Sequence, residues 1–584
     1  MMDAGAIADA VHSGEQSARA TAQTALDAID AYHTVQDTVW IERLSSTAVL
    51  EIADRTDARV AAGEHLPLAG VPFAIKDNVD LAGLPTTAGC PAFAYTPARS
   101  AVVVERLLAA GAIPMGKTNL DQFATGLNGT RSPYGAPACV RNRAFVSGGS
   151  SSGSAVAVAA GLVAFALGTD TAGSGRVPAA INGLVGLKPT RGRWSSSGLV
   201  PACRSLDCIS VFTNTIADAA LIDRVVGGFD GEDAYSRPLE DLPRAGQRIG
   251  VPLPHQRVFL GDEASAHLYA RSLDALAATG ADIVPLDIGF LNEAAQLLYG
   301  GPWLAERTAA LGPLLDSDPA AIDPVVREIV AAGQGIRAVE LFHGEYRRKA
   351  LERQATAMWE SIDLLALPTA PCVYRIAEMR QEPIRLNSAL GTYTNFVNLL
   401  DMSALALPAG CRSNGTGFGI TLIGPAHADR ALLAAGEAYL AAAALAAPPP
   451  LDLGDTMDTI KLCVVGAHLE GMPLHWQLTS RNATLVEKTH TAPTYRLYAM
   501  ANSTPPKPAL AHAEDGQEIE VEVYALDVAA FGSFVADVPP PLAIGTVTLA
   551  SGEPVKGFVA EPRALAGAED ITALGGWRAY IARG

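Results

Sequence analysis

A glycine- and serine-rich segment, residues 146–180, contains two serines that could act in covalent catalysis. Ser150 lies in the run Gly148-Gly-Ser-Ser-Ser-Gly153, and Ser174 stands between two glycines after a long apolar stretch. Glycines and small side chains let successive backbone N–H groups converge on one point, as an oxyanion hole requires. The pattern favours Ser174 as the nucleophile. The predicted backbone donors are Thr171, Ala172, Gly173 and Ser174.

Other interpretations of this segment stay open at this point. A flexible loop followed by a buried helix explains a Gly/Ser cluster by itself. A phosphate-binding loop requires a Lys-Ser/Thr pair after the glycines, and none is present. Residues 149–153 formally fit the G-x-S-x-G elbow of α/β-hydrolases. However, residues 143–146 make a poor strand before an elbow, and the 11 histidines carry no positioning signal.

A base for such a serine is available upstream, where Lys76 ends the apolar stretch of residues 71–75. Most lysines are solvated charges. At the end of a buried strand, desolvation lowers the pKa of a lysine, and the neutral amine can then accept a proton. Lys76 is therefore the predicted proton acceptor, with Ser150 relaying the proton from Ser174.

Together these motifs resemble the amidase signature family. The resemblance rests on Lys76-Asp-Asn, on Gly148-Gly-Ser-Ser-Ser-Gly153 and on Gly168-Thr-Asp-Thr-Ala-Gly-Ser-Gly-Arg-Val-Pro178. It implies a catalytic triad of Lys76, Ser150 and Ser174, a cis peptide bond between Gly149 and Ser150, and a backbone oxyanion hole over residues 171–174. Metal and organic cofactors are not expected in this chemistry.

Two positions depart from the family pattern. Ala172 stands where glycine is frequent, and Gly175 stands where an aliphatic residue is usual. Neither change removes a backbone donor. Asp170 and Arg176 are expected to brace the loop as an ion pair, which is a structural role.

Short apolar stretches alternate with helical patterns from Val71 onward, and this alternation favours an α/β layered core. Residues 1–65 carry apolar positions at helical spacing and predict two or three amphipathic helices. Strands are predicted near 71–75 and 112–115, with a helix over 102–110. Family motifs continue to about residue 430. We therefore predict a mixed β-sheet flanked by helices, over residues 1–447.

The segment 298–307 indicates how a substrate is held. Tyr299 precedes a Gly-Gly-Pro break, and Arg307 lies one turn into the helix that Pro302 should start. A planar guanidinium grips a carboxylate well, so Tyr299, Arg307 and Gly126 are the predicted substrate-binding residues. The alternative is that Trp303 only packs and Arg307 pairs with Glu306 or with solvent. This segment resembles the allophanate hydrolase branch of the family, which implies a small anionic substrate.

Three prolines at 448–450 indicate a linker over residues 448–458. Residues 459–584 predict a smaller β-rich α+β domain with strands near 461–469, 494–500 and 518–527. This part resembles the C-terminal domain of allophanate hydrolases, which is similar to γ-glutamylcyclotransferase folds. His468, in a glycine-flanked turn, is the candidate residue for a second catalytic step; capping that turn is the alternative role.

Composition excludes several classes of protein. A net charge of −18 disfavours nucleic acid as a partner. Seven scattered cysteines are typical of reduced thiols. The first residues do not form a signal peptide, and the longest apolar runs are shorter than the roughly 18 residues of a membrane span. A cytoplasmic enzyme is expected, and dimers are the commonest assembly.

The functional prediction is hydrolysis of allophanate to ammonia and carbon dioxide, with N-carboxycarbamate as first product. Urea carboxylase, which makes this ureido acid, is then the expected functional partner. Another amidase-signature amidohydrolase, or a protein like the amide-hydrolysing component of glutamyl-tRNA amidotransferase, is the first alternative. A non-enzymatic binding protein on the same scaffold is the second.

Overall fold

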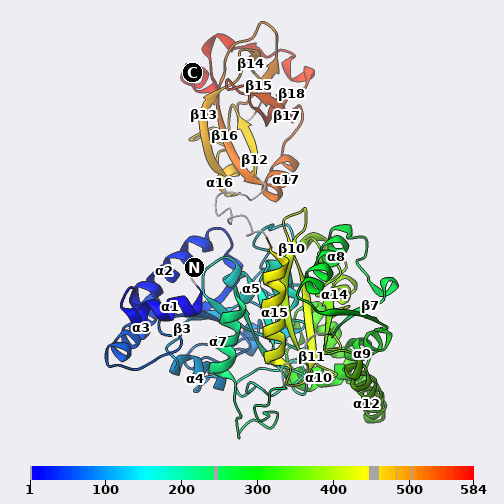
Figure 1. Ribbon diagram of the computed structural model, residues 1–584. Coiled ribbons are helices and arrows are strands. Elements are labelled where there is room, and N and C mark those ends of the chain that lie inside the picture. Colours follow the sequence, from blue (N-terminus) through cyan, green and yellow to red (C-terminus); the bar gives the residue numbers. More distant parts are fainter. Residues whose placement is uncertain are drawn as a thin grey trace. The chain divides into compact units, whose positions relative to one another are not determined.

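The computed structural model describes residues 3–242, 248–445, 459–481, 483–501, 503 and 505–583. The chain forms two compact units, Met1–Leu451 and Asp452–Gly584, and each is described by itself (Figure 1). The predicted linker, 448–458, lies outside the described residues.

A mixed sheet of 11 strands runs through the first unit in the order β1-β3-β2-β4-β6-β5-β10-β11-β9-β7-β8. Strands β2, β3 and β4 are mutually parallel, as are β7, β8 and β9, and the remaining pairs are antiparallel. The strands are β1 (Trp40–Arg43), β2 (Pro72–Lys76), β3 (Ile113–Thr118), β4 (Phe165–Asp170), β5 (Val185–Lys188), β6 (Cys208–Thr213), β7 (Arg248–Pro252), β8 (Asp282–Leu286), β9 (Leu364–Pro368), β10 (Met402–Cys411) and β11 (Gly417–Pro425).

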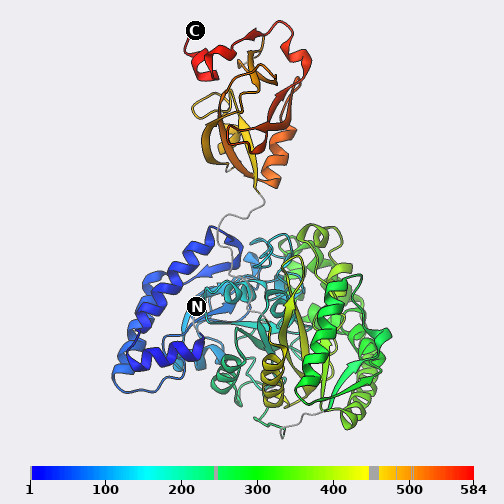
Figure 2. The same ribbon diagram turned by 45° about the horizontal axis from the view of Figure 1, so that its top comes forward.

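Helices cover both faces of this sheet, as the sequence predicts. They are α1 (Ala4–Ser13), α2 (Ala18–His33), α3 (Ser46–Ala61), α4 (Val102–Ala109), α5 (Ser152–Ala159), α6 (Val177–Asn182), α7 (Ile216–Val226), α8 (Glu263–Ala278), α9 (Gly289–Gly300), α10 (Trp303–Ser317), α11 (Pro324–Ala331), α12 (Ala338–Ser361), α13 (Ile376–Gln381), α14 (Arg385–Leu390) and α15 (Asp429–Ala443). Figure 2 shows the long helices α2 and α3 side by side (blue), which confirms helices within residues 1–65.

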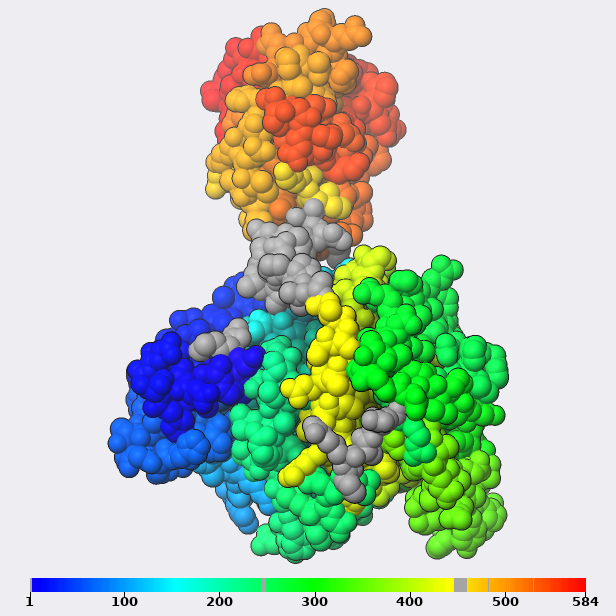
Figure 3. All heavy atoms as spheres, in the orientation of Figure 1, coloured from blue at the N-terminus to red at the C-terminus, as the bar shows by residue number. Residues whose placement is uncertain are grey.

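The strand alternation divides the core between the two faces. In β2, Phe73 and Ile75 pack with α4, α7, α8 and α15, while Ala74 between them packs with α2, α3 and α5. A period of two residues produces this division, because successive side chains of a strand point to opposite faces. In Figures 1 and 3, α15 (yellow) lies between α7 and α8 on the first of these faces.

The centre of the sheet sets the position of the site. Strands β2 and β4 are parallel neighbours, with Ile75 opposite Leu167. Their carboxyl ends, at Lys76 and Asp170, therefore lie at the same edge of the sheet. All residues of both strands are buried.

The second unit is β-rich, as predicted, with a five-stranded sheet in the order β13-β16-β12-β18-β17 and a three-stranded sheet β15-β14-β19. Its strands are β12 (Thr459–Val464), β13 (Thr484–His490), β14 (Tyr495–Ala499), β15 (Pro508–His512), β16 (Glu520–Asp527), β17 (Leu542–Thr548), β18 (Pro554–Ala560) and β19 (Glu569–Asp570). Its helices are α16 (Trp476–Thr479), α17 (Val528–Ala536) and α18 (Trp577–Ile581).

Two details of this unit differ from the sequence-based predictions. The strand expected over 461–469 ends at Val464, because the chain turns at Gly466 with Pro508 packed against it; a Cβ on Gly466 would lie 2.2 Å from Pro508 Cδ. Alternation predicts that Glu522 lies on the solvent face of its strand, yet it is buried. It accepts hydrogen bonds from Arg578 Nη2 (2.7 Å) and Tyr524 OH (2.9 Å), which compensate for its burial.

Candidate active site

Lys76 is the last residue of β2 and is fully buried. Its Nζ lies 2.7 Å from Ser150 Oγ and 2.7 Å from Thr169 Oγ1. Burial lowers the pKa of Lys76 to about 7, although Asp121, Asp207 and Asp170 act in the opposite direction. Much of the amine is therefore neutral near pH 7 and able to accept a proton.

Thr169 has no motif signal in the sequence. It lies in β4, beside β2, and it gives Lys76 a second hydrogen-bond partner besides Ser150. With one N–H of the neutral amine directed to Thr169, the nitrogen lone pair is free to accept from Ser150.

Ser150 follows a cis peptide bond from Gly149, as the family resemblance implies. Its carbonyl oxygen accepts from the N–H of Asp121 at 3.0 Å. Gly149 cannot be replaced without movement, since a Cβ there would lie 2.2 Å from Asp121 Oδ2 and 2.6 Å from Gly129 N. The loop of residues 121–131 therefore packs directly against the Ser150 turn.

Ser174 lies in the turn after β4 and is also buried. The predicted brace is present: Arg176 Nε and Asp170 Oδ2 form a fully buried ion pair at 2.9 Å. Asp170 also accepts from the N–H groups of Gly173 (2.9 Å) and Gly175 (3.0 Å). One carboxylate therefore fixes the backbone on both sides of Ser174.

The absence of a side chain at position 175 has a packing cause. A Cβ on Gly175 would lie 2.5 Å from Ser210 Oγ, on the neighbouring strand β6. The aliphatic residue that the family pattern has here does not fit beside Ser210.

The proposed oxyanion donors are not equivalent. The N–H of Gly173 donates to Asp170, so it is already used and the assignment of Gly173 as a donor is wrong in this geometry. The N–H groups of Thr171, Ala172 and Ser174 have no acceptor among the described residues. Thr171 is held by its hydroxyl, which donates to Asp207 Oδ1. Three of the four predicted donors thus remain candidates.

The 121–131 loop connects the nucleophile to the substrate-binding side. Asp121 accepts from the N–H groups of Gly129 (Oδ2, 3.0 Å) and Arg131 (Oδ1, 3.0 Å), which gives the loop one conformation. The hydroxyl of Ser174 lies 3.4 Å from the carbonyl oxygen of Gly126. Gly126 has no room for a side chain, because a Cβ would lie 2.3 Å from Asp121 Oδ2.

Arg307, in α10, is fully buried beside this loop. Its Nη1 donates to Thr125 Oγ1 at 2.9 Å and its Nη2 donates to Tyr299 OH at 3.2 Å, while its guanidinium lies 5.0 Å from the centroid of the Tyr299 ring. Tyr299, Arg307 and Gly126 therefore do come together, although the first two lie more than 170 positions beyond the third in the chain.

The alternative role for this segment is only partly correct. Trp303 is indeed buried in an apolar cluster. Arg307 does not pair with Glu306, because both oxygens of Glu306 accept from Ser205, from its N–H at 2.7 Å and its hydroxyl at 2.8 Å. The Nε of Arg307 is buried without a hydrogen-bond partner among the described residues. A buried guanidinium with unused donors is suited to an anionic ligand.

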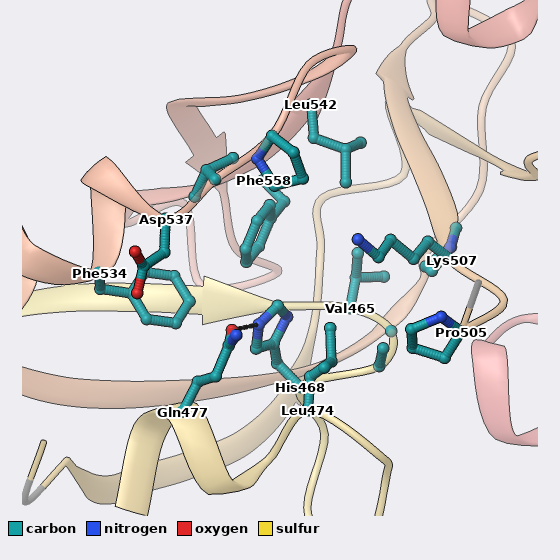
Figure 4. Close-up of a pocket in the computed structure, with 15 residues that line it drawn as sticks. Val465, His468, Leu474, Gln477, Pro505, Lys507, Phe534, Asp537, Leu542 and Phe558 are labelled. Carbon is teal, nitrogen blue, oxygen red and sulfur yellow. Dashed lines mark hydrogen bonds between the residues drawn. The ribbon is translucent and has the colours of Figure 1, made fainter. Parts of the chain in front are cut away.

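His468 does not lie in this site but in the second unit, in a cavity of about 260 Å³ (Figure 4). Its Nε2 lies 2.8 Å from Gln477 Oε1, and its ring stacks on Phe558 at 5.0 Å between centroids. Gln477 Oε1 only accepts, so Nε2 carries the proton and Nδ1 is left as an acceptor. Burial lowers the pKa of His468. Lys507 reaches toward the cavity from the side opposite Gln477.

Among the described residues, no cluster of three or more His, Cys, Asp or Glu side chains has a metal-binding arrangement. The described helices also include none with both the length and the apolar character needed to cross a membrane.

Comparison with known proteins places this site in a family. The family description "Amidase" matches residues 23–433, and "Allophanate hydrolase C-terminal domain" matches residues 460–582. The chain therefore belongs to the amidase family of amidohydrolases, and it carries a second domain of the allophanate hydrolase C-terminal type. The resemblance stated from the motifs is confirmed.

Three relatives define the neighbourhood further. Urea amidolyase of Saccharomyces cerevisiae is 44% identical over 572 residues, covering 93% of this chain and 31% of the relative. The solved structure of Kluyveromyces lactis allophanate hydrolase is 41% identical and covers 97% of this chain and 99% of that chain, with a TM-score of 0.67. A glutamyl-tRNA(Gln) amidotransferase component from Chloroflexus aggregans is 34% identical over 430 residues, covering 68% of this chain and 87% of the relative. The chain spans about a third of the length of the urea amidolyase.

Proposed function

We propose that this chain hydrolyses allophanate, using Ser174 as nucleophile and Arg307 to bind the substrate carboxylate. The observation that carries the proposal is the junction at Thr125 and Gly126. Thr125 binds the buried guanidinium of Arg307, and the next residue meets the Ser174 hydroxyl with its carbonyl oxygen. A small molecule with a carboxylate at one end and an amide at the other fits that arrangement. The names of the two fungal relatives, urea amidolyase and allophanate hydrolase, support the same substrate.

The first step is proton transfer away from Ser174. Neutral Lys76 takes the proton of Ser150 while Ser150 takes that of Ser174, whose oxygen attacks the terminal amide carbonyl. The oxyanion that forms is stabilised by the free N–H groups of Thr171, Ala172 and Ser174. Asp170 keeps these groups in place through the N–H groups of Gly173 and Gly175.

The later steps return the proton. The C–N bond breaks, the proton passes from Lys76 through Ser150 to the leaving nitrogen, and ammonia departs. Water, activated by the same relay, then attacks the acyl-enzyme and releases N-carboxycarbamate with Ser174 restored. This product loses carbon dioxide to give carbamate, which yields the second ammonia and the second carbon dioxide.

The pH dependence of kcat/KM follows from Lys76. Its pKa is lowered to about 7, and the neutral form is the active one, so activity is lost as pH falls through 7. We expect kcat/KM to decrease about tenfold per pH unit below that point and to level off above about pH 8. Ammonia release should be measured from pH 5.5 to 9, with substrate blanks and circular dichroism at each pH. A flat profile between pH 5.5 and 7 with the protein folded would contradict the role of Lys76.

Under this proposal the cavity of the second unit is the place where the first product is decarboxylated. Lys507 supplies a positive charge for a carboxylate, and Nδ1 of His468 is available as a hydrogen-bond acceptor. Capping of the turn is the alternative role of His468, but its observed partner is Gln477 rather than a backbone group of that turn.

Product stoichiometry tests the function and the role of His468 together. We expect two ammonia and two carbon dioxide per allophanate. His468→Ala should leave release of the first ammonia unchanged and delay carbon dioxide. Equal turnover of allophanate and of biuret, in which an amide replaces the carboxylate, would instead favour a general amidase. Glutamine-dependent transfer of ammonia to glutamyl-tRNA would favour an amidotransferase component. No turnover of any amide would revive the binding-protein hypothesis.

The length of the relative called urea amidolyase supports a functional partner. This chain covers 31% of it, and we assign to the rest of such proteins the carboxylation of urea that supplies allophanate. Urea carboxylase is accordingly the proposed partner of this chain, in the degradation of urea. The homodimer and the cytoplasmic location stay predictions.

A further inference from the structure

Arg131, at the end of the 121–131 loop, is a second buried arginine close to the proposed carboxylate site. Its side chain is 2% exposed. Nη1 donates to the carbonyl oxygen of Thr125 at 2.8 Å, and Nη2 donates to that of Pro383 at 2.7 Å. Its Nε has no hydrogen-bond partner among the described residues. No sequence motif pointed to this residue.

The buried arginines of the described chain fall into two groups. Five are buried: Arg131, Arg176, Arg193, Arg307 and Arg412. Three of them have a carboxylate partner: Asp170 for Arg176 at 2.9 Å, Asp223 for Arg193 at 2.7 Å, and Asp262 for Arg412 at 2.9 Å. Arg131 and Arg307 donate only to uncharged oxygens within the described residues. The two arginines without a counter-ion are thus the two that meet at Thr125.

Two buried positive charges near each other are costly without an anion. Taking a charged group out of water carries a large desolvation penalty, and a like charge nearby adds to it. Burial lowers the pKa of Arg131, and Arg307 contributes in the same direction, against the effects of Asp121, Tyr299 and Asp323. Asp121 itself is held by backbone N–H groups of the loop. An anionic ligand would relieve this imbalance.

We propose that Arg131 is a specificity-determining positioning residue of the anion subsite. It holds the backbone of Thr125, whose hydroxyl holds Arg307, and it adds a second positive charge that favours a carboxylate-bearing substrate over a neutral amide. The inference rests on the proposed function, since it concerns the same carboxylate. It extends that function by assigning the preference for an anion to a pair of arginines rather than to Arg307 alone.

The test is the ratio of kcat/KM for allophanate to kcat/KM for biuret. A general disturbance of the site lowers both constants together, so the ratio reports only on recognition of the carboxylate. In Arg131→Gln, which keeps hydrogen-bonding capacity but not charge, we expect the ratio to fall by about tenfold or more. In Arg131→Lys, which keeps the charge, we expect the ratio to stay within about threefold of the wild type.

Arg193→Met is the matched control, because it removes a buried arginine of the same unit whose partner is Asp223. It should lower the melting temperature and leave the ratio unchanged. An unchanged ratio in Arg131→Gln, with the wild type preferring allophanate, would overturn the inference and leave the proposed function standing. A loss in Arg131→Lys as large as that in Arg131→Gln would overturn the charge argument. A wild type without any preference for allophanate would overturn the proposed function itself.

Discussion

Replacing Ser174 with alanine is expected to lower kcat for allophanate by at least about 10⁴-fold, because the nucleophile of a covalent mechanism has no substitute. Lys76→Ala should cost a comparable factor, since Lys76 alone of the two relay residues can hold the proton as a cation. Ammonia release under saturating substrate measures both effects. The melting temperature of each variant shows whether the fold has survived.

Ser152→Ala provides the control for the Ser174 variant. Ser152 is also buried in the glycine- and serine-rich segment, but its hydroxyl makes only a 3.4 Å contact with the carbonyl oxygen of Asn119. Its removal should change kcat by less than about threefold. Near-normal turnover in Ser174→Ala or Lys76→Ala would refute the assigned relay. A fluorophosphonate that labels the wild type and not Ser174→Ala would identify the nucleophile directly.

Replacing Arg307 with methionine is expected to reduce kcat/KM for allophanate by about 100- to 1,000-fold, because a charge-assisted pair in a buried site is lost. The constant for biuret should change by less than about fivefold, since biuret brings no carboxylate to that position. The methionine fills a similar volume, so the packing of α10 against Tyr299 is largely kept. Steady-state kinetics on both substrates give the comparison.

Glu306→Gln is the matched control for Arg307. Glu306 is the adjacent residue of the same helix, and its carboxylate binds Ser205 rather than the proposed substrate site. It should not alter the preference for allophanate over biuret. Equal losses on the two substrates in Arg307→Met would remove the argument for a carboxylate site, while leaving the Ser174 chemistry untouched.

Local chemistry in the sequence is enough to predict the reacting groups. Lys76 is conspicuous because a lysine ends an apolar stretch, and Ser174 because glycines flank it; both signals lie within a few residues. The strand near 71–75 and the helix over 102–110 are predicted correctly, as β2 and α4, since apolar periodicity and the stop at Gly111 act locally. The layered α/β core follows from the alternation of such elements.

Contacts between distant segments could not be predicted in the same way. Thr125 and Arg307 are separated by 182 positions, and Arg131 and Pro383 by 252. No spacing rule indicates such pairs, because the fold of the whole sheet brings them together. The use of Gly173 by Asp170 escapes prediction for a similar reason: the glycine pattern shows that a backbone N–H is accessible, not which acceptor reaches it first.

Gly175 and Ser210 occupy one volume between two adjacent strands, so evolution must change them as a unit. Ser210 Oγ is buried and has no hydrogen-bond partner in the described chain, which means that its hydroxyl can be lost at little cost. A homologue that carries an aliphatic residue directly after its nucleophile should therefore have glycine or alanine at the position of Ser210. Sequence covariation between these two sites would trace how one lineage exchanged bulk across the catalytic turn without moving it.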